Sequence, residues 1–429
     1  MYRLLTLIFA GLFLTISASE MFSQSRTYSP YSRYGLGELI APGNSWNKTM
    51  GGTGIGISAN DRLNSLNPAS YSAIDSMSFN IDLGISSNLQ SLRSNNATQN
   101  YNDTNFDYLT FGFLLHKRVG FSIGLTPVSQ AGYQFQTGDG SGDSSIQTSS
   151  GFGNISSIYG GLGYNVFGNF SIGANVSYWF GDVYHKTYVY FPYNSNSMTT
   201  GIKNEHTIST VLVHFGAQHT FNLSEDKSIT IGATYSPSLK VNGESQRLVA
   251  NGTAVGIEND LFADNIIISS DTIFWGDSNF KFPSKIGGGA SYNIKNKLLI
   301  AADYSLSNWG SVNFPDNGIT TTADASSFGA GIEWVPNERT GRRYFSRIKY
   351  RAGFNYSNEY LKINNNQLTN TNFSAGLGLP LRRSKTAINI GYSYGTRKIS
   401  MPGSLKETYQ TISLSIFMDE MWFFKRKIN

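Results

Sequence analysis

Apolar and small polar residues alternate with a period of two in one segment after another from residue 77 to near the C-terminus. Over 170–180, for example, Phe170 and Ile172 lie on one face of the chain, whereas Ser171 and Gly173 lie on the other. A period of two is typical of β-strands, whose successive side chains point to opposite faces. The sequence therefore predicts an all-β protein built from many strands.

A soluble β-sandwich would show the same alternation, and three features favour a transmembrane antiparallel β-barrel instead. The apolar face often ends in Tyr or Trp, whose rings belong at the level of the lipid headgroups. Many of the strands run for about ten residues or longer, which is enough to cross a bilayer at a tilt. The other face is rich in Gly, Ser, Thr and Asn, which suits a wet or plugged lumen. Charged residues make up only 14% of the chain, against about 25% in ordinary soluble domains.

The strands number about fourteen, and single-chain outer-membrane barrels have an even number of strands. We predict that they begin near Met77, Asn105, Arg118, Gly153, Asn169, Glu205, Ser228, Ser284, Lys297, Ala325, Phe345, Thr371, Lys385 and Thr408. The connections alternate in length. Short turns are predicted at 117, 167–168, 223–227, 294–296, 336–344 and 381–384, and long polar loops near 90–103, 131–151, 182–203, 241–283, 308–324, 360–370 and 397–407. Outer-membrane barrels have short periplasmic turns and long external loops, so both ends of the predicted barrel lie on the periplasmic side.

Four regions follow along the chain. Residues 1–23 predict a secretory signal, because Arg3 precedes an apolar core too short to span a bilayer as a helix, and small residues follow it; an N-terminal anchor helix is the alternative. Residues 24–76 do not alternate, and we expect them to plug the lumen; a periplasmic tail is the alternative. The barrel is expected over 77–418, and a short periplasmic tail over 419–429.

Two motifs lie in the segment before the first strand. One is the run Met-Gly-Gly-Thr-Gly, and the other is Asn-Pro-Ala at the end of a helix candidate over 60–66. Their residues are Gly51, Gly52, Gly54, Asn67, Pro68 and Ala69. This pair, just ahead of a strand, resembles the hatch of the FadL-type long-chain fatty-acid transporters. Looser matches follow in order at 282–289, 302–304, 351–356 and 376–380.

The resemblance implies a fourteen-stranded barrel closed by an N-terminal hatch, which takes up fatty acids or other hydrophobic molecules by diffusion. In this family the ligand is thought to leave sideways, through a gap made by a kink in the third strand. Pro127 lies inside the predicted third strand, 121–130, and proline removes a hydrogen bond from the ladder. Pro127 is therefore a candidate for the strand kink and lateral gate. The alternative is that it merely ends the strand at the outer rim.

Four charged residues point into the lumen according to the alternation, namely Asp303, Glu333, Lys349 and Arg351. Glu333 and Lys349 lie on neighbouring strands across one turn, and we expect them to pair. Lys349 or Arg351 could attract the carboxylate of a ligand. The interpretation that we favour is that these charges form salt bridges that hold the hatch.

Several function classes have little support. The chain has no Cys, so disulfides and thiolate metal sites are excluded. The five His form no metal-ligand or nucleophile pattern, and no G-x-S-x-G motif is present, so we expect no enzyme activity, no metal and no other cofactor. The net charge of +5 is spread in short basic clusters, which does not favour binding to nucleic acid.

The leading hypothesis is an outer-membrane protein for passive uptake of hydrophobic small molecules, with membrane lipid and the hydrophobic ligand as its partners. The alternative is a non-transporting barrel subunit of an outer-membrane secretion or assembly complex. For that role, the segments Trp422–Lys427 and Ser29–Tyr34 are possible docking features for protein partners. An open porin is a third possibility, against which the predicted hatch argues.

Overall fold

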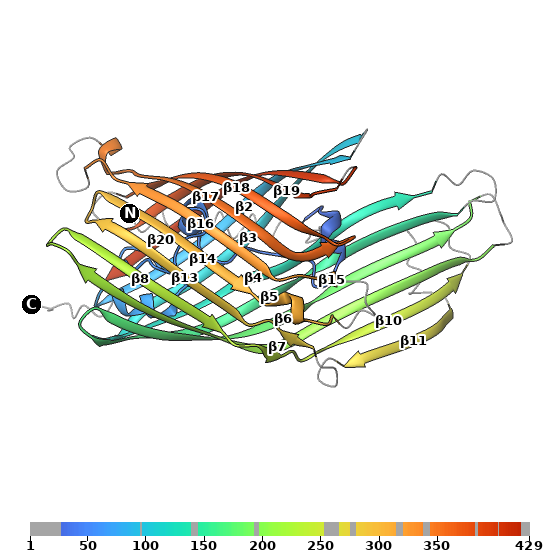
Figure 1. Ribbon diagram of the computed structural model, residues 1–429, viewed down its shortest axis with the longest axis horizontal. Coiled ribbons are helices and arrows are strands. Elements are labelled where there is room, and N and C mark those ends of the chain that lie inside the picture. The colour runs from blue at the N-terminus through green and yellow to red at the C-terminus, as the bar shows by residue number, and fades with distance from the viewer. Residues whose placement is uncertain are drawn as a thin grey trace, which may run out of the picture.

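Fourteen antiparallel strands form the wall of a closed barrel in the computed structural model (Figure 1). The structure describes residues 27–94, 97–138, 145–192, 197–252, 266–274, 280–314, 321–337, 344–381, 385–401 and 403–421. The wall strands are β2 (Ser78–Ser94), β3 (Ala97–His116), β4 (Val119–Thr137), β5 (Ile146–Phe167), β6 (Phe170–Tyr190), β7 (Thr199–Asn222), β8 (Lys227–Ser236), β13 (Lys285–Ile294), β14 (Leu298–Ser307), β16 (Ala325–Trp334), β17 (Lys349–Ile363), β18 (Asn366–Pro380), β19 (Ala387–Ile399) and β20 (Lys406–Met421). The first and last of these pair from Ser78↔Met421 to Arg93↔Lys406, which closes the barrel.

The outer face of the wall is apolar. Ile158 and Leu162 of β5 and Val176 of β6 are 46%, 49% and 54% exposed, and similar side chains follow around the barrel. Apolar area exposed to water costs about 25 cal/mol per Å², so a continuous apolar band of this kind requires lipid around it. The predicted fold class, a transmembrane antiparallel β-barrel of fourteen strands, is confirmed.

The two ends of the barrel differ. At one end, the short-turn end, the connections are brief, as at 168–169 between β5 and β6 and 295–297 between β13 and β14. At the other, the long-loop end, β4 to β7 are much longer than the strands on the opposite side of the barrel. They contain 19, 22, 21 and 24 residues, whereas β8, β13, β14 and β16 contain 10 each. Crossing a bilayer takes about 9–11 residues, so the long strands project beyond it (Figure 1, right).

A β-hairpin widens this projecting sheet. Its strands are β10 (Gly243–Gly252), which pairs with β7, and β11 (Ile266–Phe274), which pairs with β10. The remaining strands are the short β9 (Leu239–Lys240), which pairs with β12 (Lys281–Phe282), and β15 (Thr321–Thr322), which pairs with β17. The hairpin lies within the longest predicted loop, 241–283.

Four predicted loops at the long-loop end are wrong. Most of 90–103 belongs to β2 and β3, most of 131–151 to β4 and β5, and most of 182–203 to β6 and β7. Most of 360–370 belongs to β17 and β18, which turn at Asn364 and Asn365 with φ of 47° and 67°. For the same reason β3, β5, β7 and β18 begin five to eight residues before their predicted starts. Beyond the membrane the outer face of a strand no longer meets lipid, so the regular apolar alternation stops although the strand continues.

The helices are short. They are η1 (Pro30–Arg33), α2 (Ser45–Thr49), η2 (Pro68–Ala73), η3 (Trp309–Ser311) and η4 (Tyr344–Arg347). In the part of the chain that the structure describes, no helix is long and apolar enough to cross a membrane.

The segment 27–76, which we call the N-terminal segment, lies inside the barrel (Figure 1, dark blue). It contains η1, β1 (Glu38–Leu39), α2 and η2. Its helix α2 packs against β17 to β20, whereas η2 packs against β3 to β7, so the segment reaches from one side of the wall to the other. The predicted helix over 60–66 is wrong. These residues form bends, because the Asn64 amide donates to the carbonyl oxygens of Gly54 (2.7 Å) and Ile57 (3.0 Å) and ties the chain to a neighbouring loop.

Both predicted terminal regions lie mostly outside the described residues. The signal over 1–23 precedes the first described residue, Thr27. The last strand, β20, continues to Met421, so 419–421 belong to the barrel wall and not to a tail. The rest of the predicted tail, which includes Trp422–Lys427, is outside the described residues.

Candidate functional site: a filled lumen and a seam in the wall

The N-terminal segment touches the wall so closely that neither side has room for a side chain. Gly51 adopts the left-handed φ of +68°, and a Cβ there would lie 2.5 Å from the carbonyl oxygen of Ala330. On the wall, a Cβ on Gly353 would lie 2.8 Å from the Cα of Gly51 and closer still to the backbone of Met50. The glycines of the lumen face thus allow backbone-to-backbone contact, and the lumen at this level is filled.

The second motif fixes the other end of the segment. The Asn67 side chain accepts a hydrogen bond from the backbone N–H of Ala69 (3.1 Å), and Pro68 is the first residue of η2. The same amide donates to the carbonyl oxygen of Ile55 (2.8 Å) and to that of Ala217 on the wall (3.2 Å). One asparagine therefore caps the helix, closes the loop before it and fastens both to β7.

Asp303 on β14 holds the loop between the two motifs. Its Oδ2 accepts hydrogen bonds from the backbone N–H groups of Gly54 (2.6 Å) and Ile55 (2.7 Å). Gly52, with φ of +77°, donates its N–H to the carbonyl oxygen of Asn47 (2.8 Å). Hydrogen bonds to a carboxylate are stronger than those between neutral groups, so these two contacts anchor the segment to the wall.

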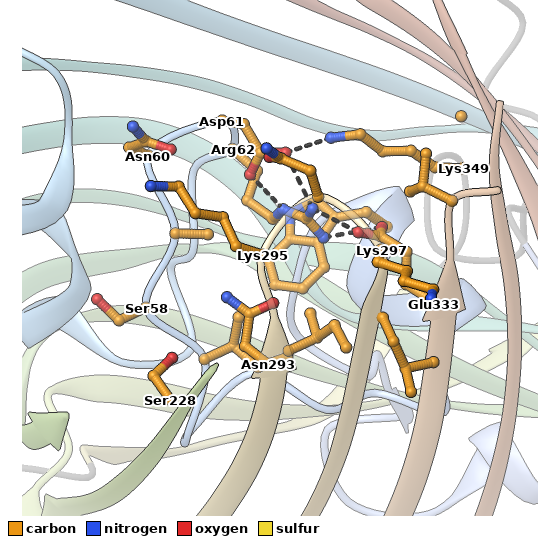
Figure 2. Close-up of a pocket in the computed structure, with 18 of the residues that line it drawn as sticks. Ser58, Asn60, Asp61, Arg62, Ser228, Asn293, Lys295, Lys297, Glu333 and Lys349 are labelled. Atoms are coloured by element: carbon orange, nitrogen blue, oxygen red, sulfur yellow. Dashed lines mark hydrogen bonds and ion pairs between the residues drawn. The ribbon is translucent and has the colours of Figure 1, made fainter. Parts of the chain in front are cut away.

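The other three lumen charges form an ionic network at the short-turn end (Figure 2). Both terminal guanidinium nitrogens of Arg62, Nη2 and Nη1, donate to the Glu333 carboxylate at 2.7 and 3.0 Å, and Arg351 Nε donates to it at 2.6 Å. Lys349 pairs with Asp61 of the N-terminal segment, so the expected Glu333–Lys349 pair is not the one that forms. The register explains the difference, because Arg351, not Lys349, lies directly opposite Glu333 across the β16–β17 ladder.

Asp61 and Arg62 were missed by sequence reasoning. Nothing in their local pattern distinguishes them from loop residues, and Arg62 meets its partner Glu333 271 residues further along the chain. Burial raises the pKa of the Asp61 carboxyl, but the charges of Arg62 and Lys349 outweigh it and hold that pKa well below its usual 3.8. The network therefore keeps its charges at neutral pH and fastens the segment to β16 and β17.

A second ionic cluster lies at the long-loop end. Arg397 of β19 contacts Glu38 of β1 (2.8 Å), Glu359 of β17 (2.8 Å) and Glu407 of β20 (3.4 Å). The Ser29 hydroxyl donates to Glu407 at 2.6 Å. These residues are scattered through the sequence, and only the closed barrel brings them together, so alternation alone could not group them.

An apolar core surrounds this end of the N-terminal segment. Tyr31 and Leu36, which are 7% and 1% exposed, pack with buried side chains of the projecting sheet and of the loops above the barrel. The wall and loop members of this core include Ala131, Ile155, Val183, Ile208, Val241, Phe280, Trp309, Phe314, Tyr360 and Leu368. The segment is thus held at one end by an ionic network and at the other by an apolar core.

The wall itself is incompletely paired between β3 and β4. These strands pair only from Leu109↔Leu125 to His116↔Val119, and at the long-loop end they separate (Figure 1). We call the two unpaired edges, 97–108 of β3 and 126–137 of β4, the seam. Pro127 lies in β4 where the seam begins, and the register of β4 with β5 shifts between Pro127 and Ser129. This places Pro127 at an irregularity inside the third wall strand, and not at the strand's end.

The N-terminal segment covers the seam from inside. Its strand β1 pairs with β4 through Glu38↔Gln130 and Leu39↔Ser129, and the N–H of Ile40 donates to the carbonyl oxygen of Val128 at 2.8 Å. On the β3 side, the ring of Tyr28 stacks on that of Tyr101 with 4.4 Å between centroids. The N–H of Gly132 on β4 also donates to the Ser32 hydroxyl (3.0 Å), so the seam is covered by a ladder of two residue pairs, a ring contact and side-chain hydrogen bonds.

A family model described as BamG matches residues 4–429. The chain belongs to the BamG family. No curated protein matches this BamG-family chain.

Solved structures with the same fold come from several bacteria. The BamG-family chain is similar to a Pseudomonas aeruginosa FadL homologue, with a TM-score of 0.60 at 12% identity, over 90% of this chain and 99% of that one. It is also similar to the P. putida toluene transporter TodX (TM-score 0.58, 15% identity, 89% and 99% covered) and to the Ralstonia pickettii toluene transporter TbuX (0.54, 16%, 87% and 97%). At these identities the likeness is one of fold, and at that level the resemblance to the FadL-type family is confirmed.

Proposed function

We propose that this BamG-family chain is a bacterial outer-membrane transport protein for hydrophobic small molecules, long-chain fatty acids or similar compounds. The ligand enters at the long-loop end and leaves sideways into the membrane at the inner end of the seam, beside Pro127, without energy input. The observation that carries the proposal is the seam, where two wall strands part and a segment from inside covers the opening. The fold shared with toluene transporters supports it.

The shortness of the β1–β4 ladder is the physical argument for a gate. A hydrogen bond contributes about 1 kcal/mol net, so parting the two β1–β4 residue pairs costs only a few kcal/mol. Unpaired backbone groups facing lipid are costly, which explains why the resting seam is covered. The rest of the cover is held by the Glu38–Arg397 ion pair and by burial of Tyr31 and Leu36 in the apolar core. A hydrophobic ligand that packs against this core offsets the loss of the β1–β4 pairs, so that β1 separates from β4 while the rest of the segment stays in place.

A disulfide across the cover tests this directly. The chain has no Cys, so a double variant Leu39→Cys/Ser129→Cys has a single possible disulfide. The two residues are register partners, and opposite Cα atoms in antiparallel strands lie about 4.5–5.5 Å apart, which suits a disulfide. In proteoliposomes loaded with a fatty-acid-binding dye, we expect oxidation to lower oleate flux at least ten-fold and dithiothreitol to restore it.

The matched control is Thr321→Cys/Lys362→Cys, a register pair of β15 and β17 that lies away from the seam. Its oxidation should leave the oleate flux unchanged. Equal flux through the oxidised and reduced forms of the seam variant would contradict lateral exit. An absence of protein-dependent flux for every hydrophobic compound tested would contradict transport itself.

A barrel subunit of an outer-membrane complex is the second candidate, and the projecting sheet favours it. Among the described residues, β11 pairs with β10 only, and an open strand edge can receive a strand from a partner protein. In the segment Ser29–Tyr34, the side chains of Ser29 and Ser32 are fully buried, which counts against docking at this segment. Native mass spectrometry of the gently extracted protein decides between the candidates. A mass above the 47.2 kDa of the chain by that of another protein favours the complex, and a monomer alone counts against it.

A further inference from the structure

A cavity opens at the short-turn end, between the N-terminal segment and the turns of the wall (Figure 2). Its volume is about 870 Å³, and we call it the vestibule. Small-molecule sites in proteins usually measure about 300–1,000 Å³, so the vestibule is of the right size for one. It lies at the opposite end of the barrel from the seam, and the N-terminal segment separates the two.

The vestibule carries an excess of positive charge. Seven basic and five acidic side chains line it. Two of the acids, Asp61 and Glu333, are engaged by Arg62, Lys349 and Arg351 in the ionic network. A third, Asp82, accepts hydrogen bonds from the Asn44 amide (2.7 Å) and the Tyr108 hydroxyl (3.0 Å). Glu225 and Asp226, the remaining two, are exposed on the β7–β8 turn.

Among the described residues three lining lysines are left without an anion, namely Lys227 at the start of β8 and two lysines of the β13–β14 turn. Lys295 and Lys297 flank Asn296, whose φ of 57° makes the tight β13–β14 turn. Both continue the lumen-facing register of their strands, Lys295 after Asn293 and Lys297 before Leu299. Among the described residues neither lysine forms an ion pair. Both side chains are exposed, and in Figure 2 they extend to opposite sides of the turn, with Lys295 on the side of Ser58 and Asn60.

Polar and apolar groups complete the lining. In Figure 2 the side chains of Lys295, Asn293, Ser58, Asn60 and Ser228 border the same space, and they come from three separate parts of the chain. Hydroxyl and amide groups there can donate hydrogen bonds to an oxyanion. Apolar side chains line the same cavity, among them Ile57, Leu299 and Val335. The vestibule therefore offers charged donors at its mouth and apolar contacts further in.

We propose that the vestibule binds the carboxylate or phosphate head of an amphipathic small molecule, with Lys295 as its anion-binding residue and Lys297 adding positive charge from the same turn. The apolar part of that molecule lies toward Ile57 and Leu299. This goes beyond uptake through the seam, because the site opens at the other end, which faces the periplasm in the proposed orientation. Failure of lateral transport would leave this site intact, and failure of anion binding would leave transport intact.

Calorimetric titration of the full chain in a non-ionic detergent tests the proposal. The probes are hexanoate, hexyl phosphate and hexanol, which share one tail and differ in the head, with detergent alone as the blank. We expect at least one anion to bind saturably and at least ten-fold more tightly than hexanol. The anion preferred tells a carboxylate ligand from a phosphate ligand. Absence of saturable anion binding, or hexanol binding as tightly as both anions, would overturn the proposal.

Substitutions locate the site. Lys295→Gln/Lys297→Gln should weaken binding of the preferred anion at least ten-fold, whereas Lys295→Arg/Lys297→Arg, which keeps both charges, should retain it. The matched control is Lys117→Gln, which removes an exposed lysine from the β3–β4 turn at the same end but outside the vestibule. An equal loss in the control, or unchanged binding in the double Gln variant, would refute the assignment of the two lysines.

Discussion

At the scale of single residues, wall glycines set how closely the N-terminal segment approaches the barrel. Gly353 faces Gly51 and Met50, and a Cβ there overlaps their backbone, which has nowhere to move inside a closed wall. Gly353→Ala should therefore destabilise the protein by about 1–3 kcal/mol, as overpacking of a filled core does. Thermal unfolding followed by circular dichroism measures the loss.

Gly288 supplies the comparison. It lies next to Gly289 on β13, and a Cβ there meets nothing within 4 Å. Gly288→Ala should change the free energy of unfolding by no more than about 0.5 kcal/mol, the usual range for a surface substitution. Equal destabilisation by the two alanines would mean that strand propensity, and not contact with the N-terminal segment, decides the cost.

The lumen charges mark how far single-residue prediction reaches. Alternation assigns Glu333 and Lys349 to the lumen face, because the side-chain period of a strand is two. It does not select their partners, since Arg62 and Asp61 belong to an irregular segment hundreds of residues away. The face of a residue is a local property of the strand, whereas its ion pair depends on the closed molecule.

At the scale of elements, the same distinction separates the strands from their lengths. The fourteen wall strands could be predicted because each crosses the bilayer with an apolar face toward lipid and a polar face toward the lumen. The ends of these strands at the long-loop side could not be predicted. There β4 to β7 continue beyond the membrane and no longer show the regular apolar alternation. The pairing of β1 with β4 could not be predicted either, because a strand of two residues is too short to show an alternation of apolar and polar residues.

Pro127 belongs to this scale as well. The sequence indicates that β4 contains a residue unable to donate to a ladder, and the structure has a register shift between Pro127 and Ser129. The separation of β3 from β4 beyond Leu125 depends on how β1, β3 and β4 pair, and no sequence pattern within β4 indicates it. The candidate was therefore accessible from the sequence, whereas the seam beside it was not.

At the scale of the whole molecule, the N-terminal segment is fastened at both ends of the lumen by different physical means. Toward the long-loop end it joins an apolar core and the Arg397 cluster, and toward the short-turn end it is held by Asp61 and Arg62. Loosening one end leaves the other attached. The proposed uncovering of the seam therefore does not require loss of the short-turn attachment.

The short-turn anchor should resist mild acid. Because Arg62 and Lys349 hold the pKa of Asp61 well below 3.8, the stabilisation is fully present above that pH and is lost only as the pH falls below it, through the lowered pKa. In planar bilayers we expect the same low ion conductance at pH 7 and pH 5, and a rise only below about pH 4. Asp61→Asn should show a raised conductance already at pH 7. Glu205→Gln, which removes a carboxylate paired with Lys203 on β7, should follow the unaltered protein. A conductance that climbs between pH 7 and pH 5 would mean that groups with ordinary or raised pKa values, and not Asp61, control the plug.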